Sequence, residues 1–401
     1  MSLHICEKKL TDSRIATMLL ALAAVASVIR QADILVPYRM LWYLNFTWIL
    51  PAAFLLCKNC KSFLDRRLWG YYAFTTIFAV YCIVMQVVTG TIFMGKDLLN
   101  IVISIGIMAT SFVYWKNYGN RPNIHFILQC LLLITAASAL KLLLTVVPEI
   151  DYSHFQKGYY LKNSVAFVFL SIITFCWAEI HNQPYKNLFW WYAAIILILI
   201  LILFLRSRAT YLGLAFVAVY VILSMKSPRK RIYAIISILL PLMIIFFIPA
   251  LHKFFIDELL LAARPLDNPN LFSSYRLSYI SNEMELMDGL WWFGKGCVYL
   301  DCFPIAMIIQ YGAVGSTIVF TFLGYVAWRI LKVKPNTYLK EAAILLFGSF
   351  MTVAIFEAHI PFGTGIKCFA FWITLGFLAA SVGRHPKIAK TEKYTWLRAN
   401  R

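Results

Sequence analysis

The residues best suited to chemistry in this sequence are three arginines and one aspartate that stand beside apolar segments. Arg206 and Arg208 join two such segments with almost no loop between them, and Arg276 and Asp301 lie in the longest polar stretch, residues 252–302. An arginine guanidinium binds phosphate oxygens through paired hydrogen bonds, and a carboxylate can take a proton from a hydroxyl group. These residue types predict a site for a phosphate-bearing ligand and a reacting hydroxyl.

The segment around Arg276 has the pattern of a short helix followed by a turn. Apolar residues recur at helical spacing over 272–288, which predicts an amphipathic helix whose apolar face is made of Leu277, Ile280, Met284 and Met287. The run 289–296 (GLWWFGKG) is rich in glycine, which permits a tight turn and a close approach of the backbone to a ligand. This region supplies three candidates for contacts with a substrate: Tyr275, Trp292 and Lys295.

Two further candidates lie between the last two apolar segments. Glu357 and His359 belong to the run 357–365 (EAHIPFGTG). A carboxylate and an imidazole can each accept a proton or bind a sugar hydroxyl. A structural turn that carries a polar histidine fits the same run equally well.

Composition assigns the chain to a membrane. Of its 401 residues 61% are hydrophobic and 14% are charged, and the mean hydropathy is +0.74. A soluble domain has about 25% charged residues, and no polar segment here is long enough to form a separate domain. We therefore expect one all-α integral-membrane domain over residues 1–401, since backbone groups in lipid must be satisfied within each helix. The net charge of +19 fits basic loops on one side of a membrane better than a nucleic-acid partner.

Twelve apolar segments are candidates for membrane-spanning helices, for which about 17 to 25 residues are typical. They cover residues 15–35, 41–57, 71–89, 97–115, 124–147, 162–180, 188–205, 209–225, 231–251, 303–328, 341–356 and 366–382. With both termini in the cytoplasm, about two-thirds of the Lys and Arg residues fall inside and about two-thirds of the Asp and Glu residues fall outside. This topology makes 252–302 a large extracytoplasmic loop and puts the 206–208 turn on the same face.

The same residues also fit structural roles. Arginines at a helix end can reach lipid headgroups, although this role is less natural for Arg206 and Arg208 on a face poor in Lys and Arg. A headgroup-facing role fits Arg276 as well as ligand binding does. Asp301 alone fits the N-cap of the following helix better than a catalytic base, and Trp292 fits an aromatic anchor at the membrane surface.

Motifs for nucleotide or metal sites are absent from the sequence. It has no GxxxxGK[ST], no HExxH and no His/Cys cluster with metal-ligand spacing. We therefore expect an activity that needs no cofactor and no metal ion.

Together these segments resemble the O-antigen ligase and O-antigen polymerase (Wzy-type) family of bacterial membrane glycosyltransferases. The resemblance covers most of the chain. Its local matches are Arg206-Ser207-Arg208, Arg276 with the turn at 293–296 (which lacks the family's usual proline), and the run from Asp301. That run is Asp301, Cys302, nine residues and Gly312-Ala-Val-Gly315, which keeps the ligase spacing but has Asp in place of the family's His and Cys in place of a small polar residue. The replacement of His favours the polymerase branch, in which this position varies.

The resemblance implies a metal-independent, GT-C-like transfer of undecaprenyl-diphosphate-linked oligosaccharides, at the outer face of a bacterial cytoplasmic (inner) membrane. Arg206, Arg208 and Arg276 would neutralise the diphosphate leaving group, and Asp301, with His359 in reserve, would take the acceptor's proton. The bilayer and a chain-length regulator and flippase of the same pathway would be its partners.

Two other functions are alternatives to a polymerase. A ligase would transfer the glycan to lipid A core. A flippase would move the lipid-linked glycan across the membrane, and inverted repeats, broken helices and charges along a central path would be typical of it. Lys141 is the one ionised residue deep within a predicted span.

Overall fold

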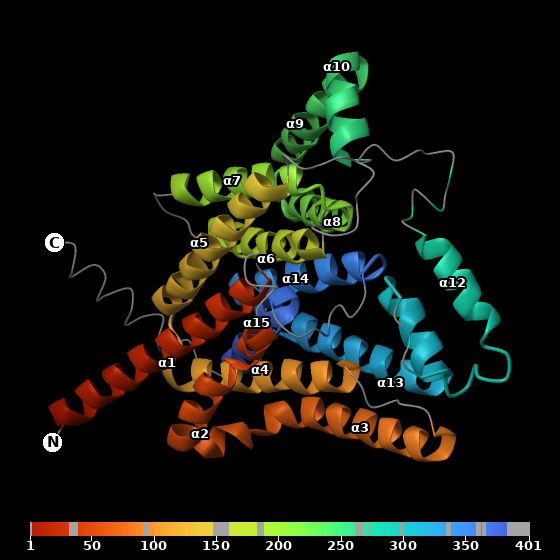
Figure 1. Cartoon of the computed structure of the whole chain (residues 1–401). Helices are drawn as coiled ribbons and strands as arrows, with labels where there is room; N and C mark the ends of the chain where they lie inside the picture. The colour runs from red at the N-terminus through yellow and green to blue at the C-terminus, as the bar shows by residue number, and fades with distance from the viewer. Residues whose placement is uncertain are drawn as a thin grey trace, which may run out of the picture.

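The computed structural model describes residues 2–31, 39–90, 96–146, 160–182, 188–260, 268, 270, 273, 275–296, 298, 300–333, 338–357, 362 and 366–382. All regular elements in these ranges are helical (Figure 1). They are α1 (Ser2–Gln31), η2 (Arg39–Phe46), α2 (Ile49–Phe63), η3 (Arg66–Leu68), α3 (Trp69–Thr89), α4 (Lys96–Tyr118), α5 (Arg121–Val146), α6 (Tyr160–Asn182), α7 (Phe189–Leu205), α8 (Arg208–Ser224), α9 (Pro228–Phe247), α10 (Pro249–His252), η4 (Lys253–Leu260), α12 (Arg276–Glu285), α13 (Phe303–Lys332), α14 (Tyr338–Ala354) and α15 (Ile366–Ser381).

Seven helical segments in the described residues are long and apolar enough to cross a membrane: Leu10–Ile29, Arg66–Thr89, Leu98–Tyr118, Arg121–Leu144, Asn163–Asn182, Pro228–Phe247 and Phe303–Lys332. The prediction of an all-α polytopic membrane protein is confirmed at this level. Three further apolar helices, Phe189–Leu205, Arg208–Ser224 and Cys368–Ser381, are shorter. The predicted span 41–57 is divided between η2 and α2, so the count of twelve stays a prediction.

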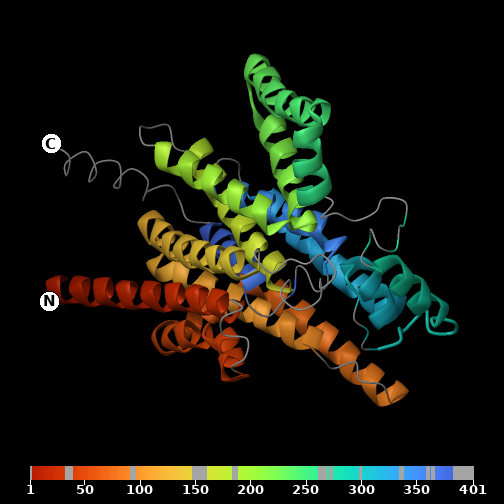
Figure 2. The same cartoon turned by 45° about the horizontal axis from the view of Figure 1, so that its top comes forward.

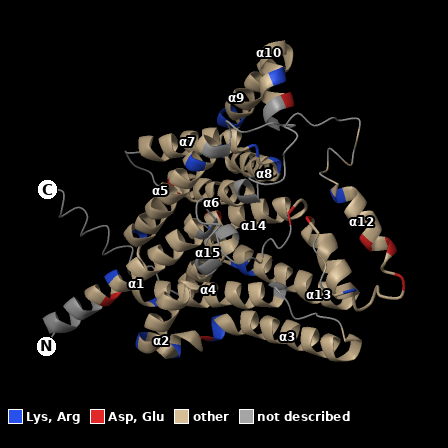
Figure 3. Cartoon of the chain, viewed as in Figure 1, with Lys and Arg blue, Asp and Glu red and all other residues tan. Residues whose placement is uncertain are grey.

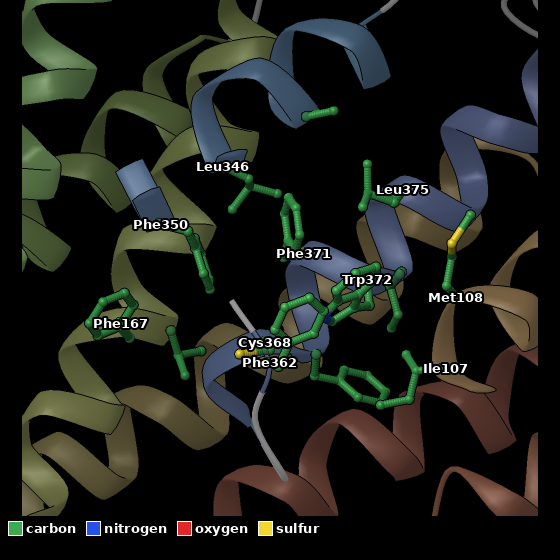
Figure 4. Close-up of a cluster of buried hydrophobic side chains, with 14 of the residues drawn as sticks. Ile107, Met108, Phe167, Leu346, Phe350, Phe362, Cys368, Phe371, Trp372 and Leu375 are labelled. Carbon is green, nitrogen blue, oxygen red and sulfur yellow. The ribbon is translucent and has the colours of Figure 1, made fainter. Parts of the chain in front are cut away.

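Helix α15 lies at the centre of the bundle. From Cys368 to Ala380 its described side chains are all buried, and they contact α4, α6 and α14. Phe371 packs on Phe350 of α14, with ring centroids 5.5 Å apart, and Phe350 packs in turn on Phe167 of α6 (Figure 4). The predicted final span, 366–382, is therefore the core helix of the bundle.

A glycine permits the close approach of α15 to α4. A Cβ atom added at Gly376 would lie 2.4 Å from the backbone oxygen of Met108 and 2.8 Å from the backbone nitrogen of Phe112. Small residues at such contacts are typical of packed membrane helices, because lipid supplies no hydrophobic force and close packing must hold the helices together.

Helices α6 and α14 run antiparallel and are joined by polar side chains at both ends. At one end Asn163 of α6 contacts Glu357, which follows α14. At the other end Asn182 of α6 donates to Glu341 of α14 at 2.7 Å, and His181 contacts the same carboxylate. We call the first of these the Glu357 end and the second the Glu341 end of the bundle.

Helix α9 stands away from the bundle, as Figures 1 and 2 both show. None of its described residues is buried, although it is one of the most hydrophobic spans. After a break at Ile248, whose backbone is extended (φ −97°, ψ 111°), helical structure resumes in α10 and the π-helical segment η4 and runs to Leu260, past the predicted loop boundary at residue 252. The apolar residues Phe254, Phe255 and Ile256 explain this extension, since they continue the pattern of the preceding helix.

Helix α13 is broken at Gly312. This residue has φ +61° and ψ −172°, which no helical residue adopts, and the two parts of α13 run in different directions (Figure 1). The break divides the predicted span 303–328 into a first part, Phe303–Tyr311, and a second part that runs to Lys332.

Candidate functional site

The centre of the candidate site is an ion-pair cluster at the Glu357 end. Arg276 Nη2 and Nε each lie 3.3 Å from Asp301 Oδ2, and Arg276 Nη2 lies 3.9 Å from Glu357 Oε1. The side chains of Arg276 and Asp301 are 26% and 31% exposed, whereas that of Glu357 is 7% exposed. A ligand can therefore reach Arg276 and Asp301 from solvent. The Glu357 carboxylate is buried and contacts the guanidinium of Arg276.

Three separate segments position these charges. Arg276 is the first residue of α12, Asp301 precedes the first part of α13, and Glu357 follows α14. The backbone N–H of Phe303 donates to the backbone oxygen of Glu357 at 3.2 Å, which holds the start of α13 against the end of α14. Asp301 is not the N-cap of α13: Cys302 occupies that position, and no side chain caps the helix. The prediction that Asp301 is the N-cap of the following helix was therefore wrong.

The inward face of helix α12 differs from the apolar face predicted from the sequence. Ile280 and Met287 do pack inward, on Leu300, Ala306 and Ile309. Leu277 and Met284 are 51% and 43% exposed instead of sharing that face. The inward row combines Arg276, Ile280 and Glu283 of α12 with Met287 just beyond its end, so this face carries both apolar anchors and charges. Figure 3 shows both basic and acidic residues along α12. An amphipathic pattern counted by hydrophobicity alone misses this, because Arg276 and Glu283 find partners of opposite charge in Asp301 and Lys295.

A chain of hydrogen bonds joins the cluster to the turn between α7 and α8. Asn163 Nδ2 donates to Glu357 Oε1 at 2.6 Å, and Ser207 Oγ donates to Asn163 Oδ1 at 2.9 Å. Ser207 is fully buried and lies between Arg206 and Arg208. The structure thus connects the two sets of arginines predicted from the sequence.

The turn itself has an unusual backbone. Arg206 caps the end of α7 with φ +51°, in the left-handed region that only a few per cent of non-glycine residues adopt. Arg208 begins α8 directly afterwards, and both arginine side chains are partly buried. Strained backbone persists where the surroundings enforce it, and it clusters at functional sites.

The glycine-rich run lies in the break of α13. The backbone N–H groups of Lys295 and Gly296 donate to the carbonyl oxygens of Ile309 and Gln310, at 2.8 and 3.1 Å. Beyond the break, the N–H groups of Ala313 and Val314 donate to Trp291 and Trp292 at 2.8 and 3.1 Å. Backbone groups that the broken helix cannot satisfy are therefore satisfied by residues 291–296. The close approach predicted for the glycines is made to α13.

Side chains on both sides fix this segment. Tyr81 of α3 donates through its hydroxyl to the carbonyl oxygens of Tyr311 and Phe293, at 2.6 and 3.0 Å. Lys295 Nζ lies 2.8 Å from Glu283 Oε2 of α12. The break in α13 is thus tied to the helix that carries Arg276, and Lys295 acts in this structure through Glu283.

The remaining candidates are more peripheral. Tyr275 has φ +62° at the start of α12 and is 54% exposed. The indole of Trp292 is 68% exposed, which fits both a sugar contact and a membrane anchor. His359 lies outside the described residues.

Asn163 and Tyr81 are the site residues that sequence reasoning missed. Asn163 stands at the start of an apolar segment, and its position on the same side as the 206–208 turn was the only available signal. Tyr81 lies within a continuous apolar run and gave no signal at all.

The structure offers neither a reactive thiol at Cys302 nor, in the described ranges, a set of metal ligands. Burial raises the pKa of the Cys302 thiol, so the thiolate needed for a nucleophile is disfavoured. Within the described ranges, no group of three or more His, Cys, Asp and Glu residues is placed to hold a metal ion.

Comparison with models of known protein families found no match, and no curated protein matches the sequence.

Proposed function

We propose that this protein is a membrane glycosyltransferase that polymerises undecaprenyl-diphosphate-linked oligosaccharide units at the outer face of a bacterial cytoplasmic membrane. The observation that carries the proposal is the meeting of Arg276, Asp301 and Glu357 at one end of the bundle, joined through Asn163 to the 206–208 turn. An arginine-rich site at a helix end beside a solvent-accessible carboxylate suits transfer from a diphosphate to a hydroxyl.

The reaction would proceed as follows. The bond between the anomeric carbon of the donor sugar and the diphosphate oxygen breaks, and the diphosphate leaves with the electron pair. Arg206, Arg208 and Arg276 neutralise the charge that develops on it. The acceptor hydroxyl oxygen forms the new bond to the anomeric carbon, and its proton passes to Asp301.

Asp301 is better placed than Glu357 to be this base. Its side chain is 31% exposed against 7% for Glu357, and one of its oxygens, Oδ2, takes both contacts with Arg276. Glu357 instead accepts the hydrogen bond from Asn163, and its carboxylate is buried next to Arg276. In the proposed topology the Glu357 end faces outward, because the excess of Lys and Arg then falls at the Glu341 end.

The first test is the activity of purified protein with a lipid-diphosphate-linked oligosaccharide. We expect chain growth with the wild type, and a loss of about a hundredfold or more in kcat for Arg276→Ala and Asp301→Asn, as for groups that act in the transition state. Polymerisation retained by both variants would refute the proposal. Cys57→Ser, an exposed cysteine outside the cluster, serves as a control and should keep the wild-type rate.

A deletion strain separates the related functions. Single repeat units on the surface lipid indicate a polymerase, whereas accumulated long lipid-linked chains indicate a ligase.

A transporter of lipid-linked glycans is the second candidate, favoured by the broken helix α13. Broken helices in transporters bind their substrate with the backbone groups that the break releases. Here the released groups of Ile309, Gln310, Ala313 and Val314 already bind residues 291–296, which argues for the enzyme. Repeat units trapped inside the deletion strain would favour the transporter.

A further inference from the structure

Asn163 has partners on both sides of its amide group. Its oxygen accepts from Ser207 Oγ at 2.9 Å, and its nitrogen donates to Glu357 Oε1 at 2.6 Å. Ser207 Oγ also lies 2.8 Å from Thr210 Oγ1, and both of these residues are fully buried. A proton donated by Thr210 to Ser207 leaves the Ser207 proton for Asn163. All donors in this series of hydrogen bonds then point toward the carboxylate of Glu357. The Asn163 amide can have only one orientation, with its oxygen toward Ser207 and its nitrogen toward Glu357.

The carboxylate that receives this hydrogen bond is shared with the reacting cluster. Arg276 Nη2 lies 3.9 Å from Oε1 of Glu357, the same oxygen that Asn163 contacts. Arg276 in turn contacts Asp301 at 3.3 Å. The position of the Asn163 amide therefore sets the position of the Glu357 charge, and this charge sets where the Arg276 guanidinium lies relative to Asp301.

We propose that Asn163 is a positioning residue: it does not touch the substrate, but it orients Glu357 and through it Arg276 for the transfer step. This inference rests on the proposed function. It also gives the 206–208 turn a second role, because Ser207 fixes the amide that orients the opposite side of the site.

The protein contains its own control for a purely structural role. At the Glu341 end, Asn182 of the same helix donates to Glu341 of α14 at 2.7 Å. Both asparagines thus join α6 to the α14 segment by a hydrogen bond from an amide to a carboxylate. If Asn163 only holds the helices together, Asn163→Leu and Asn182→Leu should have the same consequences.

The decisive experiment compares kcat, KM for the lipid-linked donor and the melting temperature in these two variants. Loss of a hydrogen bond to a charged group is expected to lower kcat of Asn163→Leu about tenfold or more, with KM within about threefold of the wild type. Asn182→Leu should lower the melting temperature and leave kcat within about threefold. Equal kcat values in the two variants, or a change confined to KM, would overturn the inference.

Two further variants keep the test decisive if Asn163→Leu does not fold. Asn163→Asp conserves volume but replaces the donor with a negative charge beside Glu357, and should lower kcat about tenfold; a wild-type kcat would contradict the proposal. Ser207→Ala should lower kcat in the wild type but add little in the Asn163→Asp background, because the two act through one path. If the losses in kcat from Ser207→Ala and Asn163→Asp were fully additive, the two residues would not act through one path. A wild-type protein without transfer activity would instead refute the proposed function itself.

Discussion

Arg276 uses two different nitrogen atoms of one planar group. Nε and Nη2 both approach Asp301 Oδ2, and Nη2 also faces Glu357. A guanidinium holds these donors in a rigid fork, so its position relative to two carboxylates is fixed once Asp301 and Glu357 are fixed. A lysine ammonium is a single point on a flexible stem and cannot reproduce this arrangement. The identity of the residue matters here as well as its charge.

Arg276→Lys should therefore recover only part of the activity lost in Arg276→Ala, with kcat about tenfold to a hundredfold below the wild type. Lys295 provides the matched control, because it makes a single contact with Glu283 at 2.8 Å. Lys295→Arg keeps that charge pair and should stay within about threefold of the wild-type rate. If Arg276→Lys also stayed within about threefold of the wild-type rate in the same donor-turnover assay, Arg276 would be shown to act only through its charge.

At this scale the sequence predicted the charged groups of the site but not their connections. Arg276, Asp301, Glu357 and the 206–208 turn stand beside apolar helices, where a charge is expensive, and so they could be singled out. Asn163 is uncharged and stands where a helix starts, so its polarity needed no special explanation. Its role appears only when α6, α8 and α14 are packed together.

At the scale of elements, the break in α13 is a junction of three backbone segments: residues 291–296 and the two parts of α13. Gly294 and Gly312 both have positive φ and lie against each other: a Cβ on Gly312 would lie 2.4 Å from the nitrogen of Phe293, and one on Gly294 2.3 Å from the oxygen of Gln310. Only glycine satisfies both conditions at these positions. Gly312, the first glycine of the Gly312-x-x-Gly315 run that suggested a family pattern, therefore has a physical cause in this chain.

Gly312→Ala should destabilise the protein by about 1–3 kcal/mol through overlap, in addition to about 1–3 kcal/mol for a backbone conformation that essentially only glycine adopts (φ +61°, ψ −172°). Gly289 separates the two effects, since it has φ +77° and open space around it. Gly289→Ala should show the backbone cost alone. The measurement is thermal unfolding of the detergent-solubilised protein, and equal losses in the two variants would mean that residues 291–296 are not packed into the break.

The pattern of the sequence could not show this break. Residues 303–328 form an uninterrupted apolar run, and hydrophobicity predicts one straight helix from such a run. The helix is broken because another segment supplies the missing hydrogen bonds. That segment is too polar to be read as part of a membrane span, and its contacts with α13 are tertiary.

At the scale of the whole molecule, an ionic cluster fastens the end of the bundle where α15 finishes. Asp65 contacts Arg67 at 2.8 Å and Lys116 of α4 at 2.9 Å. Arg67 also donates to the carbonyl oxygens of Ala380 and Val382 at the end of α15. One carboxylate thus links the start of α3, the end of α4 and the end of α15. The hydrogen bond from Arg67 is the main reason that the pKa of Asp65 is lowered well below its usual value.

This linkage predicts a pH dependence of stability. An Asp with a lowered folded-state pKa contributes its full stability above the unfolded pKa of about 3.9, and this contribution is lost as the pH falls through the folded pKa. The melting temperature of the wild type should therefore fall more steeply from about pH 5 to pH 3 than that of Asp65→Asn. Asp257→Asn, at a half-exposed position, should keep the wild-type slope. Parallel curves for the wild type and Asp65→Asn would refute the role of this cluster.

The arrangement of the helices in the bundle could not be predicted from the sequence. Apolar content identified the membrane helices, but α15 and α9 have similar hydrophobicity and opposite environments: α15 is buried from Cys368 to Ala380, and no described residue of α9 is buried. Helices in lipid are apolar all round, so amphipathicity does not report which face is packed. Contacts such as Gly376 against Met108 decide the arrangement.

The central place of α15 has a consequence for how the protein is made. Its main partner, α4, precedes it by roughly 250 residues, which a ribosome adds in about 12 to 50 s at about 5 to 20 residues per second. During this interval the part of α4 around Ser111, against which Gly376 of α15 packs in the folded protein, has not yet met this partner. The nascent chain thus passes through a period in which its central helix is missing, and in this period it is most exposed to membrane proteases and chaperones.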